Sequence, residues 1–140
     1  MRRVIAAGIC VAACLFSGCD TEIQGAQEAV RKQLIDPDSA KFEGVHVIKS
    51  TGAVCGYVNA KNRMGGYVGQ TPFFYTREAG AVLVKEMPSE RDFERVFDSK
   101  WSTEDDKLEL IYTCMNAHKW ENTCNKKGFF PPNKYCPEKT

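Results

Sequence analysis

The first hydrophobic pattern in the chain is an apolar run from Val4 to Phe16, which directly follows Met1, Arg2 and Arg3. A short positive end followed by about a dozen uncharged, mostly apolar residues is typical of an export signal. Crossing a bilayer as a helix takes roughly 20 such residues. The run is therefore too short to predict a permanent membrane span.

Beyond this signal, the hydrophobic spacing predicts a helix over residues 21–35. Its apolar residues lie three or four positions apart, on one face, and they are Ile23, Ala26, Val30 and Leu34. Pro37 prevents the helix from continuing. The Asp and Ser residues around Pro37 predict a turn or a single helical turn over residues 36–41.

From Phe42 the spacing changes to that of strands. The first two strands are joined by a turn at Ser50, Thr51 and Gly52, and a turn at residues 77–80 joins the last two. We expect an antiparallel sheet of three or four strands, with segments at residues 42–48, 54–58, 72–76 and 81–85.

Two more helices are predicted after Pro88. Ser89 and Asp92 form a capping pair, followed by an apolar stripe of Phe93, Val96, Phe97 and Trp101. A further helix begins near Ser102 or Thr103, with a predicted buried face of Leu108, Ile111, Tyr112 and Met115. Residues from Asn116 onward are expected to be irregular. The predicted fold class is α+β, with a disulfide-held C-terminal tail.

Residues 15–19, Leu-Phe-Ser-Gly-Cys, resemble the lipobox of bacterial lipoproteins, in which two small residues precede a cysteine. The resemblance implies that a signal peptide of residues 1–18 is removed and that the Cys19 thiol carries diacylglyceryl. Two alternatives stay open: Cys14 lies in a similar pattern inside the apolar run, and ordinary secretion would leave Cys19 free. Several acyl chains, such as palmitate, give a stable hold on a membrane.

This assignment sets the expected location and domain organisation. The chain would face the periplasm, and Asp20 resembles the signal that keeps lipoproteins of enteric bacteria in the inner membrane. After the signal we expect a lipidated N-terminus and tether at 19–27, a compact domain at 28–115 and a tail at 116–140. The whole chain has 19 basic and 18 acidic side chains. This balance without a basic cluster argues against a nucleic-acid partner.

The chain has seven cysteines. Cys10 and Cys14 would be removed with the signal and Cys19 would carry the lipid, which leaves four. These four are Cys55, Cys114, Cys124 and Cys136. An even number in an oxidising compartment predicts two disulfides. Their spacing lacks the close pairs typical of zinc sites. Of three pairings, we favour Cys124 with Cys136 and Cys55 with Cys114.

Three segments carry a further resemblance: residues 36–42 (DPDSAKF), residues 55–62 (CGYVNAKN), and residues 65–69 (GGYVG) with Pro72 and Phe73. They resemble a set of small exported proteins of bacteria and their prophages, many with lipoprotein signals. The likeness covers about residues 28–76. It implies a compact α+β module and supplies no catalytic residues. Members commonly carry an acidic residue where this chain has Tyr57.

The candidate chemistry is sparse. His46 and His118 lack a neighbouring nucleophile motif, and the carboxylate pairs fit turn and cap roles. We therefore expect no catalytic residue, no metal and no cofactor. The most suggestive segment is the glycine-rich loop 59–69, whose candidate binding residues are Asn59, Lys61, Asn62, Arg63 and Tyr67. Such loops often bind on a rigid frame, although the asparagines could serve the turn alone.

Two functions follow as hypotheses. The first is a non-catalytic binding or inhibitory lipoprotein of the envelope, similar to an immunity or exclusion factor, with a protein partner. The prophage resemblance favours this one. The alternative is a structural accessory subunit of an envelope or secretion complex.

Overall fold

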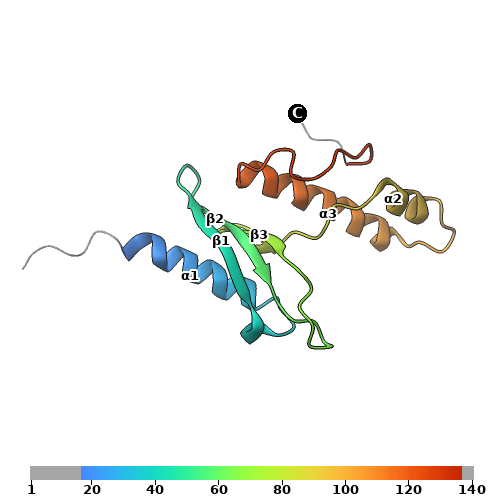
Figure 1. Cartoon of the computed structure of the whole chain (residues 1–140). Helices are drawn as coiled ribbons and strands as arrows, with labels where there is room; N and C mark the ends of the chain where they lie inside the picture. Colours follow the sequence, from blue (N-terminus) through green and yellow to red (C-terminus); the bar gives the residue numbers. More distant parts are fainter. Residues whose placement is uncertain (1–16, 137–140) are drawn as a thin grey trace, which may run out of the picture.

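The computed structural model describes residues 17–136, with side chains from Asp20 onward. Helix α1 (Ser17–Arg31) covers one face of a four-stranded sheet, and helices α2 (Glu90–Phe97) and α3 (Glu104–Thr123) lie with the tail on the other side (Figure 1). The predicted α+β class is confirmed. Among the described residues, no helix is both long enough and apolar enough to cross a bilayer.

The sheet has the predicted antiparallel order, β1-β2-β3-β4. Its strands are β1 (Lys41–Ile48), β2 (Ala53–Asn59), β3 (Thr71–Thr76) and β4 (Gly80–Leu83). The pairing of β1 with β2 shifts between Glu43 and His46, where Gly44 takes a φ of 60°. Glycine reaches this φ at little cost. At the opposite edge, Gln33 Nε2 donates a hydrogen bond to Ala81 O at 2.5 Å.

Helix α1 ends at Arg31, earlier than the predicted Ile35, because the last turn tightens. Gln33 N donates to Val30 O and Leu34 N donates to Arg31 O, both at 3.0 Å. Such short-range bonds are common at helix ends. Residues 19–27, expected as lipidated N-terminus and tether, belong to the helix backbone.

Two apolar cores lie on the two faces of the sheet. The core under α1 contains Val30, Val58 and Phe73. It is packed so closely that a Cβ on Gly56 would lie 2.9 Å from Val45 Cγ2. The second core joins the sheet to α2, α3 and the tail through buried side chains that include Phe74, Val84, Phe93 and Trp120.

Both later helices start with a capping box. Ser89 Oγ accepts from Asp92 N at 3.3 Å, and Asp92 Oδ2 accepts from Ser89 N at 2.9 Å. Thr103 and Asp106 repeat the arrangement. Hydrogen bonds from the Ser89 hydroxyl and amide hold the pKa of Asp92 below its usual range. The amide and hydroxyl of Thr103 do the same for the pKa of Asp106.

Helix α3 departs from the prediction in length and in orientation. It continues to Thr123, so residues 116–123 are helical and not irregular. The predicted buried face is also wrong: its four side chains are 41–59% exposed, and they are Leu108, Ile111, Tyr112 and Met115. The helix instead buries Cys114, Ala117, Trp120 and Glu121.

The physical reason lies in what each half of α3 contacts. Its first half extends past the sheet beside α2, whereas its second half lies against the sheet and the tail (Figure 1). Within the predicted apolar stripe of α2, Phe93 is 2% exposed, but Phe97 is 47% exposed and Trp101 is 92% exposed. Trp101 also lies beyond the end of α2.

Two disulfides form as predicted, but the favoured pairing is wrong. Cys55 of β2 bonds to Cys124 at the end of α3, and Cys114 of α3 bonds to Cys136 of the tail. Because α3 continues to Thr123, Cys124 reaches the sheet and Cys114 faces the tail. One helix is thereby linked covalently to both of its neighbours.

The unequal loops of the two bridges lead to a testable difference in stability. They span 69 and 22 residues, so the chain-entropy model gives about 4.4 and about 3.4 kcal/mol. We expect the Cys55→Ala/Cys124→Ala variant to lose roughly 1 kcal/mol more unfolding free energy than Cys114→Ala/Cys136→Ala. Urea unfolding of both variants measures this, and the reverse ranking would contradict it.

Candidate functional site

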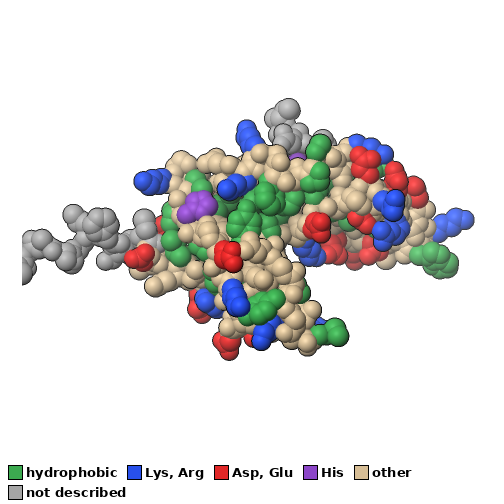
Figure 2. Space-filling view, in the orientation of Figure 1, with side chains coloured by type: hydrophobic (Ala, Val, Ile, Leu, Met, Phe, Trp, Pro, Cys, Tyr) green, Lys and Arg blue, Asp and Glu red, His purple; other side chains and the backbone are tan. Residues whose placement is uncertain are grey.

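A groove of about 660 Å³ lies between the sheet and the tail. This volume is within the range of ligand pockets in proteins. Apolar side chains are exposed where the sheet meets α3 in Figure 2. The groove is lined by Tyr57, Val68, Gln70, Thr71, Pro72, Val84, Lys85, Glu86, Phe129 and Phe130.

The aromatic side of the groove is built around Trp120. Its indole is buried and its Nε1 donates to Phe73 O at 3.2 Å, which satisfies the one polar atom of the ring. Tyr57 and Phe129 pack against it with ring centroids 5.9 and 4.9 Å away, both edge-on. Edge-on packing suits the charge distribution of aromatic rings. Phe129 stays 51% exposed, so it offers an apolar surface to a ligand.

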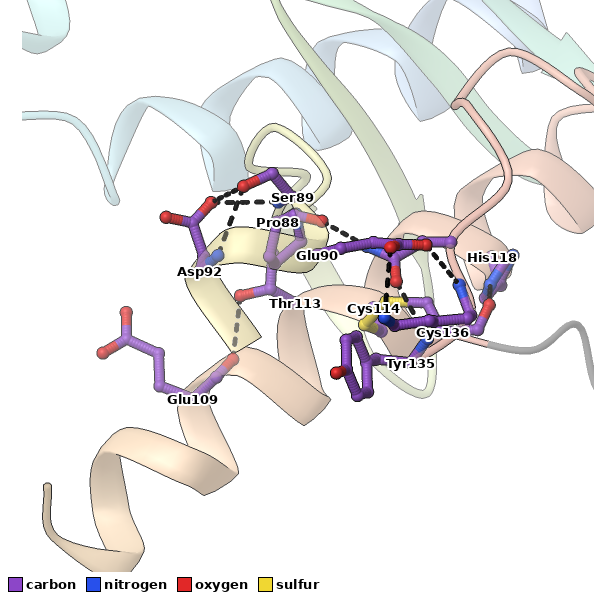
Figure 3. Close-up of a disulfide and its surroundings, with 12 residues drawn as sticks. Pro88, Ser89, Glu90, Asp92, Glu109, Thr113, Cys114, His118, Tyr135 and Cys136 are labelled. Atoms are coloured by element: carbon purple, nitrogen blue, oxygen red, sulfur yellow. Dashed lines mark hydrogen bonds and ion pairs between the residues drawn. A yellow bond between two sulfur atoms is a disulfide. The ribbon is translucent and has the colours of Figure 1, made fainter. Parts of the chain in front are cut away.

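A buried carboxylate positions the tail. Glu121 of α3 is 3% exposed, and its Oε1 accepts from Phe130 N at 2.9 Å. Its Oε2 lies 3.3 Å from Nδ1 of His118, and Nε2 of that ring lies 2.8 Å from Cys136 O. Because a carbonyl oxygen can only accept, Nε2 is the donor in the second contact. Glu121 and His118 thus hold the tail. His118 lies beside the Cys114–Cys136 bridge (Figure 3).

Contacts with α2 and with Pro88, shortly before it, hold the end of the tail. Asn133 Nδ2 donates to Pro88 O at 2.6 Å. Lys134 Nζ lies 3.3 Å from a carboxylate oxygen of Glu94 and of Glu90. These hydrogen bonds, with Glu94 the stronger influence, raise the pKa of Lys134 above its usual value. The position of Phe129 and Phe130 therefore depends on these attachments of the tail to α2 and α3, and not on the chain alone.

Polar side chains make up the rim of the groove. Gln70 donates to Glu43 across the end of the sheet. Lys85 Nζ donates to Glu109 Oε1 of α3 at 2.5 Å. A groove with an aromatic floor and a polar rim is suited to hold an apolar side chain of a partner and to fix its orientation with a few hydrogen bonds.

The predicted binding loop uses its asparagines within the turn. Asn62 Oδ1 accepts from Met64 N at 2.9 Å and from Gly66 N at 3.1 Å. Asn59 Oδ1 accepts from Gly69 N at 3.1 Å. These bonds add to the backbone pairing across the loop, in which Asn62 N donates to Gly66 O at 2.9 Å and Val68 N donates to Ala60 O at 3.3 Å.

The other predicted loop residues lie near Tyr67. Lys41 and Lys61 place their Nζ atoms 4.4 and 5.6 Å from the centroid of the Tyr67 ring, which is a cation–π arrangement. The Tyr67 hydroxyl donates to Ser39 O at 3.3 Å. Arg63 is exposed at the tip. The structure thus brings Lys61 and Tyr67 together, whereas the groove takes Val68 and Gln70 from the end of the loop.

Sequence reasoning did not identify the groove residues Tyr57, Phe129 and Phe130 as a site. The one available signal was the pair of adjacent phenylalanines before two prolines in the tail. This signal was not sufficient, because the disulfide pairing decides which surface the tail contacts. Cys19 lies in the α1 backbone, and its side chain is outside the described residues.

The remaining candidate chemistry has structural roles in the described chain. His46 Nδ1 lies 2.8 Å from Gly44 O, beside the irregular part of β1. Over residues 17–136, no three His, Cys, Asp or Glu side chains gather as a metal site would require. Comparison of the chain with protein-family models, curated proteins and solved structures finds no match. The resemblance to small exported prophage proteins stays a prediction.

The Asn62 turn can be tested by amide hydrogen exchange. In Asn62→Ala, the Met64 and Gly66 amides lose their shared acceptor, so we expect both to exchange about five-fold faster, since each bond contributes about 1 kcal/mol. Arg63→Ala changes an exposed neighbour and is the matched control. Unchanged exchange of both amides in Asn62→Ala would show that the turn does not depend on this side chain.

Proposed function

We propose that the mature chain is a lipid-anchored protein of the bacterial envelope, which binds another protein without catalysing a reaction. Its action would resemble that of an immunity or exclusion factor. The anchor rests on the sequence: the positive end, the apolar run and the lipobox that ends at Cys19. The binding activity rests on the groove.

The groove supports protein binding because its shape is fixed before a partner arrives. Glu121 and two disulfides hold the tail and the sheet around α3, so little conformational entropy is lost when a ligand enters. The half-exposed ring of Phe129 sits beside the buried Trp120. An exposed aromatic on a rigid base is a common centre of protein interfaces.

The direction of α1 is compatible with an anchored binding protein. Loop 59–69, whose last residues border the groove, lies away from the start of α1 (Figure 1). The helix has 15 residues and is therefore about 22 Å long. With lipid on Cys19, the groove would face away from the membrane surface, where a soluble or membrane-bound protein can reach it.

The anchor is tested by the chemistry of the mature N-terminus. We expect mass spectrometry of the protein from membranes to find Cys19 as the first residue, with diacylglyceryl on its sulfur. Cys19→Ser should stay unlipidated and uncleaved at this site. Cys14→Ser is the matched control and should be processed normally. Loss of lipid in Cys14→Ser alone would instead assign the lipobox to residues 11–14.

The binding activity is tested by affinity capture from the native envelope. We expect the lipidated chain to retain one stoichiometric partner, and Phe129→Glu to lose it because a charge would enter the aromatic floor. Ile35→Glu changes a side chain that is 64% exposed outside the groove, and it should retain the partner. Quantitative mass spectrometry of the three captures compares them.

The identity of the captured protein separates the two functions. A single toxin, hydrolase or phage protein would support inhibition. Several subunits of one envelope complex would support the accessory role and would contradict the inhibitor. Equal capture by Phe129→Glu would exclude the groove as the binding site.

A further inference from the structure

Helix α3 has two apolar faces, and the fold covers only one of them. Successive residues of a helix turn by about 100°, so the buried Ala117 and Trp120 point away from Leu108 and Met115. We call the second face the outer face. Its apolar members are Leu108 (46% exposed), Ile111 (41%), Tyr112 (59%) and Met115 (50%). A surface helix of a monomer normally has one apolar stripe, so the outer face lacks an explanation within the chain.

The outer face has opposite charges at its two ends. Glu104 lies one turn before Leu108, and Lys119 lies one turn after Met115, both exposed and on the same side of the helix. The Lys119 ammonium now lies 5.7 Å from the centroid of the Phe74 ring, a weak cation–π contact that an exposed lysine can leave. From start to end, the face therefore consists of an acid, four apolar residues and a base. When a second copy runs in the opposite direction, its base lies opposite the acid of the first copy, and the apolar residues of the two copies lie opposite each other.

We propose that the outer face of α3 binds the outer face of a second copy of this chain, with the two helices antiparallel. A two-fold axis passing between Ile111 and Tyr112 would place Ile111 opposite Tyr112 of the other copy. The same axis would place Leu108 opposite Met115 and Glu104 opposite Lys119. Each contact occurs twice, as in any interface in which one patch binds itself.

Electrostatics favours this orientation over a parallel one. In a parallel pair, the acidic starts of both helices would meet, and Glu104, Asp105 and Asp106 of the two copies would repel each other. In the antiparallel pair, the acidic start faces Lys119, and the helix dipoles are also opposed. Glu104 now pairs with Lys107 at 2.8 Å, but the Glu104 side chain is 84% exposed. Such exposed pairs are weak, so the carboxylate can exchange its partner.

The fold leaves room for a second helix on this face. The sheet lies against Trp120 and the tail against Glu121 and Cys114, on the inner side of α3. The end of β4 reaches the flank of the outer face, where Leu83 and Lys85 border a hollow beside Leu108 and Tyr112. On a neighbouring side, Lys107 Nζ lies 6.0 Å from the Phe97 ring of α2. The contact from Glu104 to Lys119 would be about 22 Å long. The axes of the two packed helices would lie about 8–10 Å apart.

The order of charges along the outer face also favours a second copy over an unrelated protein. An unrelated partner requires no symmetry in the order of charges along the face. A second copy requires it, and Glu104 and Lys119 provide it at equal distances from the centre of the face. This surface is separate from the groove, so both could be occupied at once.

The dimer is tested on the full chain in detergent, by sedimentation velocity in density-matched buffer. We expect a dimer for the natural sequence. Met115→Glu should weaken dimerisation by about ten-fold or more, because a carboxylate would lie opposite Leu108 of the other copy within the apolar contact. Met64→Glu changes a side chain that is 93% exposed in loop 59–69, and it should dimerise normally. Both variants should keep the native circular dichroism, since neither side chain is in a core.

A charge exchange separates this dimer from other arrangements. We expect Glu104→Lys and Lys119→Glu each to weaken the dimer, and the double variant Glu104→Lys/Lys119→Glu to restore it. A monomer at all concentrations up to about 1 mM, the level of very weak association, would overturn the proposal. So would a dimer that Met115→Glu leaves intact, or single charge variants whose loss the double variant does not restore.

Discussion

The contact between Trp120 and its neighbours is the interaction on which the second half of the structure depends. The indole lies where α3, the sheet and the tail meet, and its Nε1 bonds to the Phe73 carbonyl. Without this ring, the aromatic floor would have no base and α3 would lose its main apolar contact with β3. The Cys55–Cys124 bridge lies at the same junction, so a large apolar contact and a covalent bond reinforce each other there.

The strands and helix starts could be predicted because each is determined by nearby residues. Apolar spacing gave the four strands, and the capping pair of Ser89 and Asp92 gave the start of α2. The buried face of α3 could not be predicted in this way. Its most apolar stripe is the one left in solvent, while the buried side includes Glu121, whose partner is a tail amide far along the chain. Local hydrophobicity cannot distinguish two such faces.

The candidate site was harder to predict from the sequence than the strands, because it also depends on contacts between distant residues. Loop 59–69 was recognised from its glycines and polar residues, yet Asn62 bonds to its own turn. The groove depends on Tyr57 and Phe129 meeting around Trp120, and this contact follows from the disulfide pairing. With three possible pairings, the tail could lie against three different surfaces. Only the structure decides among them.

The edges of the sheet have a consequence for how this protein can recognise others. At β1 the irregular pairing at Gly44 bends one edge, and β4 at the other edge is only four residues long, with one carbonyl already bonded to Gln33. Short or bent edges resist the addition of a foreign strand. Recruitment of an extended peptide by backbone pairing is therefore disfavoured, and so is edge-to-edge aggregation. Selectivity for a partner then depends on side chains, which point mutations can retune without altering the sheet.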